Sequence, residues 1–205
     1  MNALARRLMT VTVATTVAVV GAVTLTGSAA FARPTNNSVT QTAFIWNCPT
    51  GVAGCAAEQA RVGDVRTVDG QITDVCRVAG TTMNLVYNRT NRTGAADRTG
   101  FLYRSNLQQP GLQTDTCTGN GVAASAPVGT LQLLCPYSTC GRTGDMDTGE
   151  TMLAFCDTSI SGERFLLTVL FNKNTGGPLT AGFISEDNLN GGGPLLQSDC
   201  ENPNF

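Results

Sequence analysis

Gly100-Phe101-Leu102-Tyr103-Arg104-Ser105-Asn106-Leu107 recurs as Gly182-Phe183-Ile184-Ser185-Glu186-Asp187-Asn188-Leu189, with Gly, Phe, an aliphatic residue, Asn and Leu at identical spacing. Outward from this stretch, Cys48-Pro49 is matched by Cys135-Pro136, and Tyr87-Asn88-Arg89 by Phe171-Asn172-Lys173. The cysteines follow in the same order, as Cys48, Cys55, Cys76 and Cys117 and then as Cys135, Cys140, Cys156 and Cys200. The chain therefore carries one unit twice. The period is too long for a solenoid repeat and suits a small domain.

The apolar runs of both units are short and end at Gly, Asp, Asn or Pro. Examples are Met83 to Tyr87 in the first unit and Phe165 to Phe171 in the second. Such β-branched or aromatic runs between turn residues are typical of short antiparallel strands. No window sustains a helical period with caps. We therefore expect an all-β fold of two small barrels or sandwiches in tandem.

The N-terminal residues 1–32 have the pattern of a secretory signal peptide. Arg6 and Arg7 precede an uncharged apolar run, and Ala30-Phe31-Ala32 places small residues at a cleavage site. An uncleaved membrane anchor is the alternative, but threonines dilute the run and the cleavage site follows it. We expect a secreted, extracellular protein with no stable membrane insertion after signal cleavage.

The composition of the remaining chain sets the unit boundaries. The composition of residues 33–42 predicts a disordered leader. Residues 43–118 are expected to form the first repeat, and residues 130–205 the second. Between the repeats, residues 119–129 have no charge and no large side chain, which predicts a flexible linker.

The chain has 205 residues and no histidine, which excludes Ser-His-Asp and Cys-His catalysis and imidazole metal sites. The carboxylates lie mostly in turn-like sequence and favour surface positions. Cys135 and Cys140 do not have zinc-finger spacing. We therefore expect a protein that is not an enzyme, without metal or other cofactor. The acidic balance of the whole chain also argues against nucleic-acid binding.

Eight cysteines in an exported chain indicate disulfides. If each unit closes its own bonds in the same way, three pairing patterns remain. We favour the pattern in which the first two cysteines close a local loop and the third, at the end of a strand, holds the C-terminal tail. The predicted bonds are Cys48–Cys55, Cys76–Cys117, Cys135–Cys140 and Cys156–Cys200.

The ending Gly-Phe-[Leu/Ile]-x-x-x-Asn-Leu of each unit resembles the Gly-Trp-Val-x-x-x-x-Leu ending of bacterial SH3-like domains. The segments after Gly70 and Gly149 resemble the strand that precedes a cysteine in that family. Tandem copies behind a signal peptide are common among its secreted actinobacterial members. The resemblance implies two small SH3-like β-barrels, each stapled by two disulfides, and binding to cell wall or peptide. The two cysteine loops depart from the family, and Phe101 and Phe183 replace its Trp.

Arginines interleaved with tyrosines gather in the first unit, which carries more basic than acidic residues, whereas the second unit is acidic. Arginine beside tyrosine can stack on or fork around an anionic ligand. The alternative is a solvated loop. The candidate ligand-binding residues are Tyr87, Arg89, Arg92, Tyr103 and Arg104. Trp46, the single tryptophan, is expected in the core or at a barrel rim, with sugar stacking as the alternative.

Two functions from different classes follow. The first is a secreted, non-catalytic binding protein for cell wall or an extracellular peptide. The second is a secreted inhibitor or signalling protein that acts on another protein through the loops closed by Cys48–Cys55 and Cys135–Cys140, since a loop fixed beforehand loses less entropy on binding.

Overall fold

The computed structural model describes residues 33–53, 55, 60–89 and 98–201, which form two antiparallel six-stranded sheets. The predicted signal peptide lies outside these residues. The first sheet contains β1 (Thr35–Asn37), β2 (Ala43–Trp46), β3 (Arg61–Val65), β4 (Ile72–Arg77), β5 (Met83–Asn88) and β6 (Arg98–Tyr103). The second contains β7 (Val122–Ala124), β8 (Leu131–Leu133), β9 (Arg142–Asp145), β10 (Glu150–Ile160), β11 (Glu163–Asn172) and β12 (Pro178–Ser185).

Helical structure in the described residues is limited to single turns. These are α1 (Cys117–Asn120) and the 3-10 turns η1 (Thr67–Asp69), η2 (Arg104–Asn106), η3 (Glu186–Asn188) and η4 (Asn190–Gly192). In the part of the chain that the structure describes, no helix has the length and apolar character needed to cross a membrane. The expected all-β fold is confirmed.

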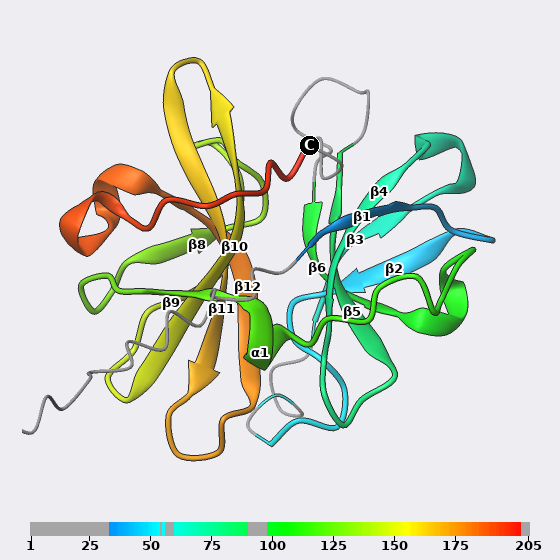
Figure 1. Cartoon of the computed structure of the whole chain (residues 1–205), viewed down its shortest axis with the longest axis horizontal. Coiled ribbons are helices and arrows are strands. Elements are labelled where there is room, and N and C mark those ends of the chain that lie inside the picture. The colour runs from blue at the N-terminus through cyan, green and yellow to red at the C-terminus, as the bar shows by residue number, and fades with distance from the viewer. Residues whose placement is uncertain (1–32, 54, 56–59, 90–97, 202–205) are drawn as a thin grey trace, which may run out of the picture.

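The two sheets have the same topology. Their orders are β1-β4-β5-β6-β2-β3 and β7-β10-β11-β12-β8-β9, so each strand has its counterpart at the same place. In Figure 1 the first sheet lies on the right and the second on the left, with α1 between them. The duplication seen in the sequence is therefore a duplication of the fold.

The pairing register corrects one part of the sequence alignment. Leu85 lies opposite Cys76 and Phe101, and Leu167 lies opposite Cys156 and Phe183. Leu85 and Leu167 are thus equivalent, which makes Val169 the counterpart of Tyr87. The motif that matches Tyr87-Asn88-Arg89 with Phe171-Asn172-Lys173 is out of register by two residues. A shift of two keeps a side chain on the same face of a strand, so the apolar pattern alone does not reveal it.

Each sheet has a β-bulge just before its strand cysteine. The register shifts between Asp74 and Cys76 in β4 and between Ala154 and Cys156 in β10. The skipped residues, Val75 and Phe155, are both buried in the core between the sheets. A bulge adds one residue and bends its strand, and here it occurs at the same place in both copies.

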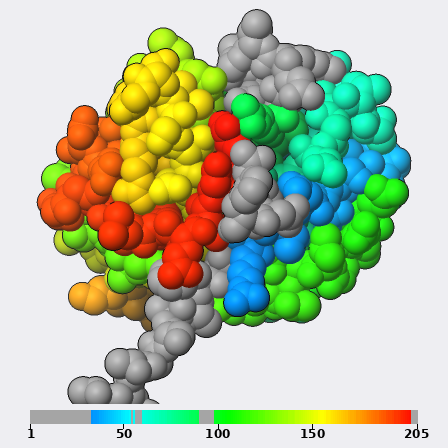
Figure 2. All heavy atoms as spheres, turned by 45° about the horizontal axis from the view of Figure 1, so that its top comes forward, coloured from blue at the N-terminus to red at the C-terminus, as the bar shows by residue number. Residues whose placement is uncertain are grey.

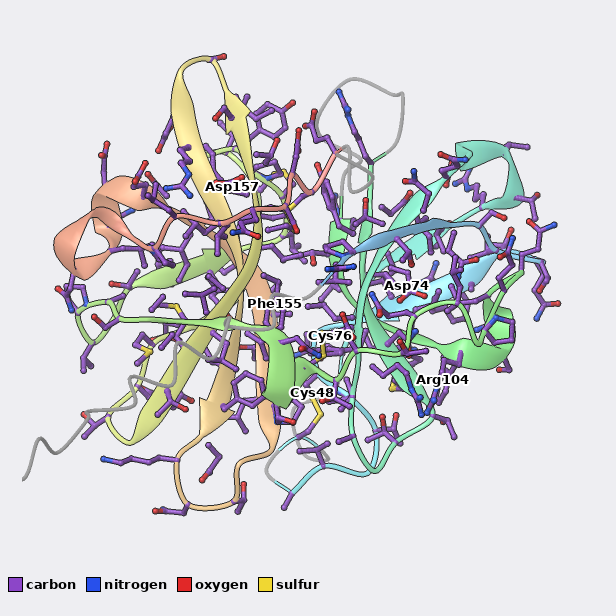
Figure 3. The ribbon with its side chains drawn as sticks, viewed as in Figure 1. Cys48, Asp74, Cys76, Arg104, Phe155 and Asp157 are labelled. Carbon is purple, nitrogen blue, oxygen red and sulfur yellow. A yellow bond between two sulfur atoms is a disulfide. The ribbon has the colours of Figure 1, made fainter. Side chains whose placement is uncertain are left out.

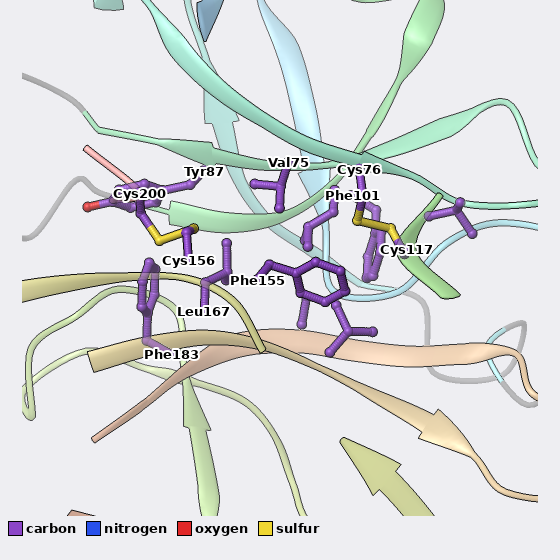
Figure 4. Packing of buried hydrophobic residues seen from close by; sticks show 14 of the residues in the cluster. Val75, Cys76, Tyr87, Phe101, Cys117, Phe155, Cys156, Leu167, Phe183 and Cys200 are labelled. Atoms are coloured by element: carbon purple, nitrogen blue, oxygen red, sulfur yellow. A yellow bond between two sulfur atoms is a disulfide. The ribbon is translucent and has the colours of Figure 1, made fainter. Parts of the chain in front are cut away.

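The main core lies between the two sheets and contains residues of both units (Figure 4). Met83, Tyr87 and Phe101 enter it from the first sheet, and Leu167 and Phe183 from the second. A smaller apolar cluster lies on the other face of each sheet. The strand order leaves β1, β3, β7 and β9 at sheet edges, and no closure into a barrel is seen among the described residues. The described units are thus open sheets with a common core.

The predicted leader and linker each contribute an edge strand. Residues 35–37 of the leader pair with β4, and residues 122–124 of the linker pair with β10. Short, polar or small residues can occupy such positions because an edge strand is paired along one side only.

The structure forms the four predicted disulfides, Cys48–Cys55, Cys76–Cys117, Cys135–Cys140 and Cys156–Cys200, with Cα atoms 5.8, 5.0, 5.8 and 5.1 Å apart. The tails beyond Asp115 and Ser198 run beside the strand cysteines, where Arg77 N donates to Asp115 O and Asp157 N to Ser198 O. The C-terminal segment then lies along the boundary between the units (Figure 2, red), where Cys200 O accepts from Thr73 Oγ1 at 2.6 Å.

Candidate functional site

The structure separates the ligand-binding residues that the sequence predicts. Tyr87 is fully buried between the sheets, so its ring is not presented to a ligand there. Arg92 lies outside the described residues. Arg89 is placed just after the C-terminal end of β5, whereas Tyr103 pairs with Met83 at the start of that strand. Arg89 follows Met83 by six residue steps, which along a strand are roughly 20 Å, so Arg89 and Tyr103 do not form one site.

The three accessible predicted residues all have partners within the protein. Arg89 forms an ion pair with Glu201 at 2.8 Å, across the boundary between the units. The Tyr103 hydroxyl lies 2.8 Å from Thr50 Oγ1 and joins the Cys48–Cys55 loop to β6. A guanidinium nitrogen of Arg104 donates to Thr81 O. Their roles in the described structure are thus at least partly structural.

A different group of side chains lies on β2 and β3, with Phe44 exposed and Trp46 partly buried against the main core, as the sequence predicts for Trp46. Phe44 and Trp46 are two residues apart on β2 and therefore share a face. Their ring centroids lie 6.5 Å apart at an interplanar angle of 83°. Arg61, on β3, places its guanidinium carbon 3.8 Å from the centroid of the Phe44 ring. Phe44 keeps 44% of its surface exposed. We call Phe44, Trp46, Arg61 and Asp64 the aromatic–arginine face.

Asp64 balances the charge of this face. Its carboxylate lies 3.8 Å from an Arg61 nitrogen and accepts a hydrogen bond from Arg66 Nε at 3.2 Å. One carboxylate thus faces two guanidinium groups, each about half exposed. The face as a whole keeps a positive charge beside an exposed aromatic ring, an arrangement that suits an anionic or planar ligand group.

The second sheet carries the same constellation without the aromatic rings. The register makes Leu131 and Leu133 equivalent to Phe44 and Trp46, because Leu131 pairs with Asp145 as Phe44 pairs with Asp64. Leu133 pairs with Arg142 as Trp46 pairs with Arg61. The second copy therefore offers aliphatic side chains in place of a ring that can stack.

The sequence contains a signal for this face that the sequence interpretation missed. Arg61-Val62-Gly63-Asp64 recurs as Arg142-Thr143-Gly144-Asp145. The glycine of the motif has a structural role, since a Cβ at Gly63 would lie 2.8 Å from Arg98 Cγ and one at Gly144 would lie 2.9 Å from Thr180 Oγ1. Only the arginine and the aspartate are left to face outward. A search for short motifs that recur at the same place in both units would have identified this arginine and this aspartate.

A polar pocket of about 360 Å³ lies in the second unit, at the β10–β11 hairpin and η3. Arg164 lines it and donates to Asp157 at 2.6 Å, to Glu186 at 2.9 Å and to Pro194 O at 2.9 Å. Burial acts against the charge of Arg164, but the two carboxylates hold its pKa above its usual value. Because its donors are engaged within the protein, Arg164 ties the hairpin to the segment after η4.

The described residues contain no group of three or more cysteine or carboxylate side chains placed to hold a metal ion. Asp145 and Glu150 lie on different strands, β9 and β10. Glu150 instead accepts a hydrogen bond from Asp147 N at 2.9 Å.

No family model, no curated protein and no solved structure matches this chain.

Proposed function

We propose that this chain is a secreted, non-catalytic binding protein with two SH3-like units, and that its first unit engages a cell-wall or peptide ligand. The observation that carries the proposal is the Arg61 guanidinium held 3.8 Å from the ring of an exposed Phe44. The exposed Phe44 ring adds little to the core, and it stays available to a ligand beside a cation. Aromatic residues and arginine are enriched among the residues that contribute most to binding energy.

The ligand chemistry follows from the charges. Arg61 and Arg66 outnumber Asp64, so the face favours a ligand with a carboxylate or phosphate next to a flat or apolar group. Wall polymers and peptides both provide such groups. On the counterpart face of the second unit, the exposed Leu131 can add a weaker apolar contact, and two linked contacts gain avidity.

The test is sedimentation of the protein with purified cell wall, and binding of short acidic peptides, at low and high salt. Phe44→Ala and Arg61→Ala should each weaken binding about tenfold, since a desolvated cation–π contact is worth about 1–2 kcal/mol. Arg142→Ala is the matched control at the equivalent place in the second unit and should have little effect. Full binding by both Phe44→Ala and Arg61→Ala, or no binding of wall or peptide by the unaltered protein, would contradict the proposal.

An inhibitor or signalling function through the disulfide loops is the second candidate. Ser138 and Thr139 are exposed within the Cys135–Cys140 loop, and Thr50 is exposed in the Cys48–Cys55 loop, held by Tyr103. Replacing Ser138 and Thr139 by Ala should then abolish capture of a protein partner while wall binding persists. The two candidates are distinguished by which set of substitutions removes binding.

A further inference from the structure

One place in the duplicated fold holds polar side chains in the first unit and apolar ones in the second. The pairing registers of β1 with β4 and of β5 with β6 define three positions that are buried in the first sheet, and the same registers define them in the second sheet. They are occupied by Asn37, Asp74 and Asn84 in the first sheet and by Ala124, Ala154 and Leu166 in the second. The second unit thus shows that the fold does not need a carboxylate there.

Asp74 is fully buried, and the side-chain amides of Asn37 and Asn84 donate hydrogen bonds to its carboxylate. Asn84 Nδ2 lies 2.9 and 3.1 Å from the two carboxylate oxygens. Asn37 Nδ2 donates to Oδ2 at 3.2 Å. Figure 3 shows Asp74 within the first unit, away from the boundary between the units. A buried carboxyl without a direct ion pair is costly when ionised.

Asn37 also connects this carboxyl to a segment that covers β1, residues 107–113, which we call the strap. Its Nδ2 donates to Gln109 O at 3.0 Å, and its Oδ1 accepts from Gln109 N at 3.2 Å. Gln108 N donates to Ser38 O at 2.8 Å. At the far end of the strap, Gln113 Nε2 donates to Asp74 O at 3.1 Å. The strap is therefore attached to β1 and β4 around Asp74.

The second unit contains the matched arrangement without the carboxyl. Asn190 N donates to Ser125 O at 2.9 Å, as Gln108 N donates to Ser38 O. Because Ala124 and Ala154 replace Asn37 and Asp74, the second unit has no titratable side chain at the position of Asp74. It is an internal control in the same molecule.

Burial raises the pKa of Asp74 to about 6, although the hydrogen bonds from Asn84 and Asn37 and the charge of Arg104 oppose the shift. Among the described residues, Arg104 of η2 provides the charge that acts on Asp74, and β1, β5 and the strap face it with amides and apolar groups. Two carboxylates of neighbouring segments have hydrogen-bond donors of their own. Asp69 accepts a hydrogen bond from Arg66 N, and Asp115 accepts one from Arg33 N.

We propose that Asp74 and Asn37 form a pH-dependent latch, which holds the strap on β1 while Asp74 is protonated and loosens it when Asp74 ionises. Opening the strap admits water to the carboxylate, so ionisation stabilises the open state more than the closed state. The folded carboxyl binds its proton more tightly than a solvated one. The closed strap is therefore favoured at acidic pH and loses stability as the pH rises through about 6.

The test is amide hydrogen exchange of the full oxidised chain between about pH 4 and about pH 8, corrected for intrinsic exchange. The opening constant at Gln108 and Gln109 should rise on the order of tenfold or more across this range, while that at Asn190 stays constant. Equal pH dependence at Gln108 and Asn190 would overturn the latch.

Two variants separate the latch from general instability. Asp74→Asn keeps the shape and removes the charge, so the strap should stay closed at both ends of the range. The triple variant Asn37→Ala, Asp74→Ala and Asn84→Leu gives the first unit the residues of the second, and it too should make Gln108 behave like Asn190. Glu163→Gln, an exposed carboxyl of the second unit, should change nothing. A pH-dependent Gln108 that persists in both Asp74 variants would refute the proposal.

Discussion

The ring of Tyr87 in the first unit meets the ring of Phe183 in the second edge-on, with centroids 5.0 Å apart and an interplanar angle of 71° (Figure 4). Both side chains are fully buried. Edge-to-face contacts of this kind add to the stabilisation from buried area. The contact crosses the boundary between the repeats, which makes the stability of each unit depend on the other.

Tyr87→Ala should destabilise the whole protein rather than the first unit alone. Loss of a large buried aromatic side chain costs about 3–5 kcal/mol, and the lost packing lies in the core that both sheets share. Chemical denaturation followed by Trp46 fluorescence and by far-UV circular dichroism should give one coincident transition shifted to lower denaturant. Phe44→Ala, at an exposed position, should shift it by less than about 1 kcal/mol. Two separate transitions, with only one of them shifted, would show that the units are independent.

The long-range and the short-range disulfides should contribute differently to the free energy of unfolding. The sequence separation is 44 residues for Cys156–Cys200 and 5 for Cys135–Cys140. In the chain-entropy account, removal of the long-range bond costs about 4 kcal/mol and removal of the short one about 2 kcal/mol. Double Cys→Ser variants of each pair, compared by urea denaturation, measure this difference. Equal losses would indicate that the short loop stabilises by contacts rather than by entropy.

Arg164→Met should loosen the β10–β11 hairpin from the segment that contains Pro194. The guanidinium is about one-fifth exposed and bonds two carboxylates, so its removal leaves Asp157 and Glu186 without their shared cation. We expect a loss of about 2 kcal/mol, less than for a fully buried pair because solvent screens it in part. Arg61→Met, on the exposed aromatic–arginine face, is the control and should cost under about 1 kcal/mol. Thermal unfolding of the two variants decides between these values.

Asp74→Asn should change how global stability depends on pH. Since burial raises the pKa of Asp74 to about 6, this carboxyl stabilises the folded state below its usual pKa, and that contribution is lost as the pH rises through about 6. The shift of about two pKa units corresponds to roughly 3 kcal/mol. The stability difference between Asp74→Asn and the unaltered protein should therefore move in favour of the variant from about pH 4 to about pH 8. A difference that is constant with pH would mean that Asp74 titrates normally.

The repeat and the cysteine pairing could be predicted from the sequence because both are local or ordered signals. The spacing of Gly100 to Leu107 and of Gly182 to Leu189 marks the same turn from a strand into a 3-10 turn in both copies. Cys48 and Cys55 are close enough in the chain to close a loop whatever structure the rest of the chain adopts. The short apolar runs likewise indicate strands, since they are too short for helices.

The packing of the sheets could not be predicted in this way. All six residues of β5 are buried, including the polar Asn84 and Asn88 on one of its faces, so the sequence pattern does not show which neighbour covers the face that carries Tyr87. Tyr87 therefore looked like a surface residue beside arginines, whereas the second sheet covers it. Nothing in the sequence indicated that Asp74 is buried either, because a carboxylate is normally exposed. Phe44 and Arg61 are separated in the chain and meet only because β2 and β3 pair, so their face exists only in the folded protein.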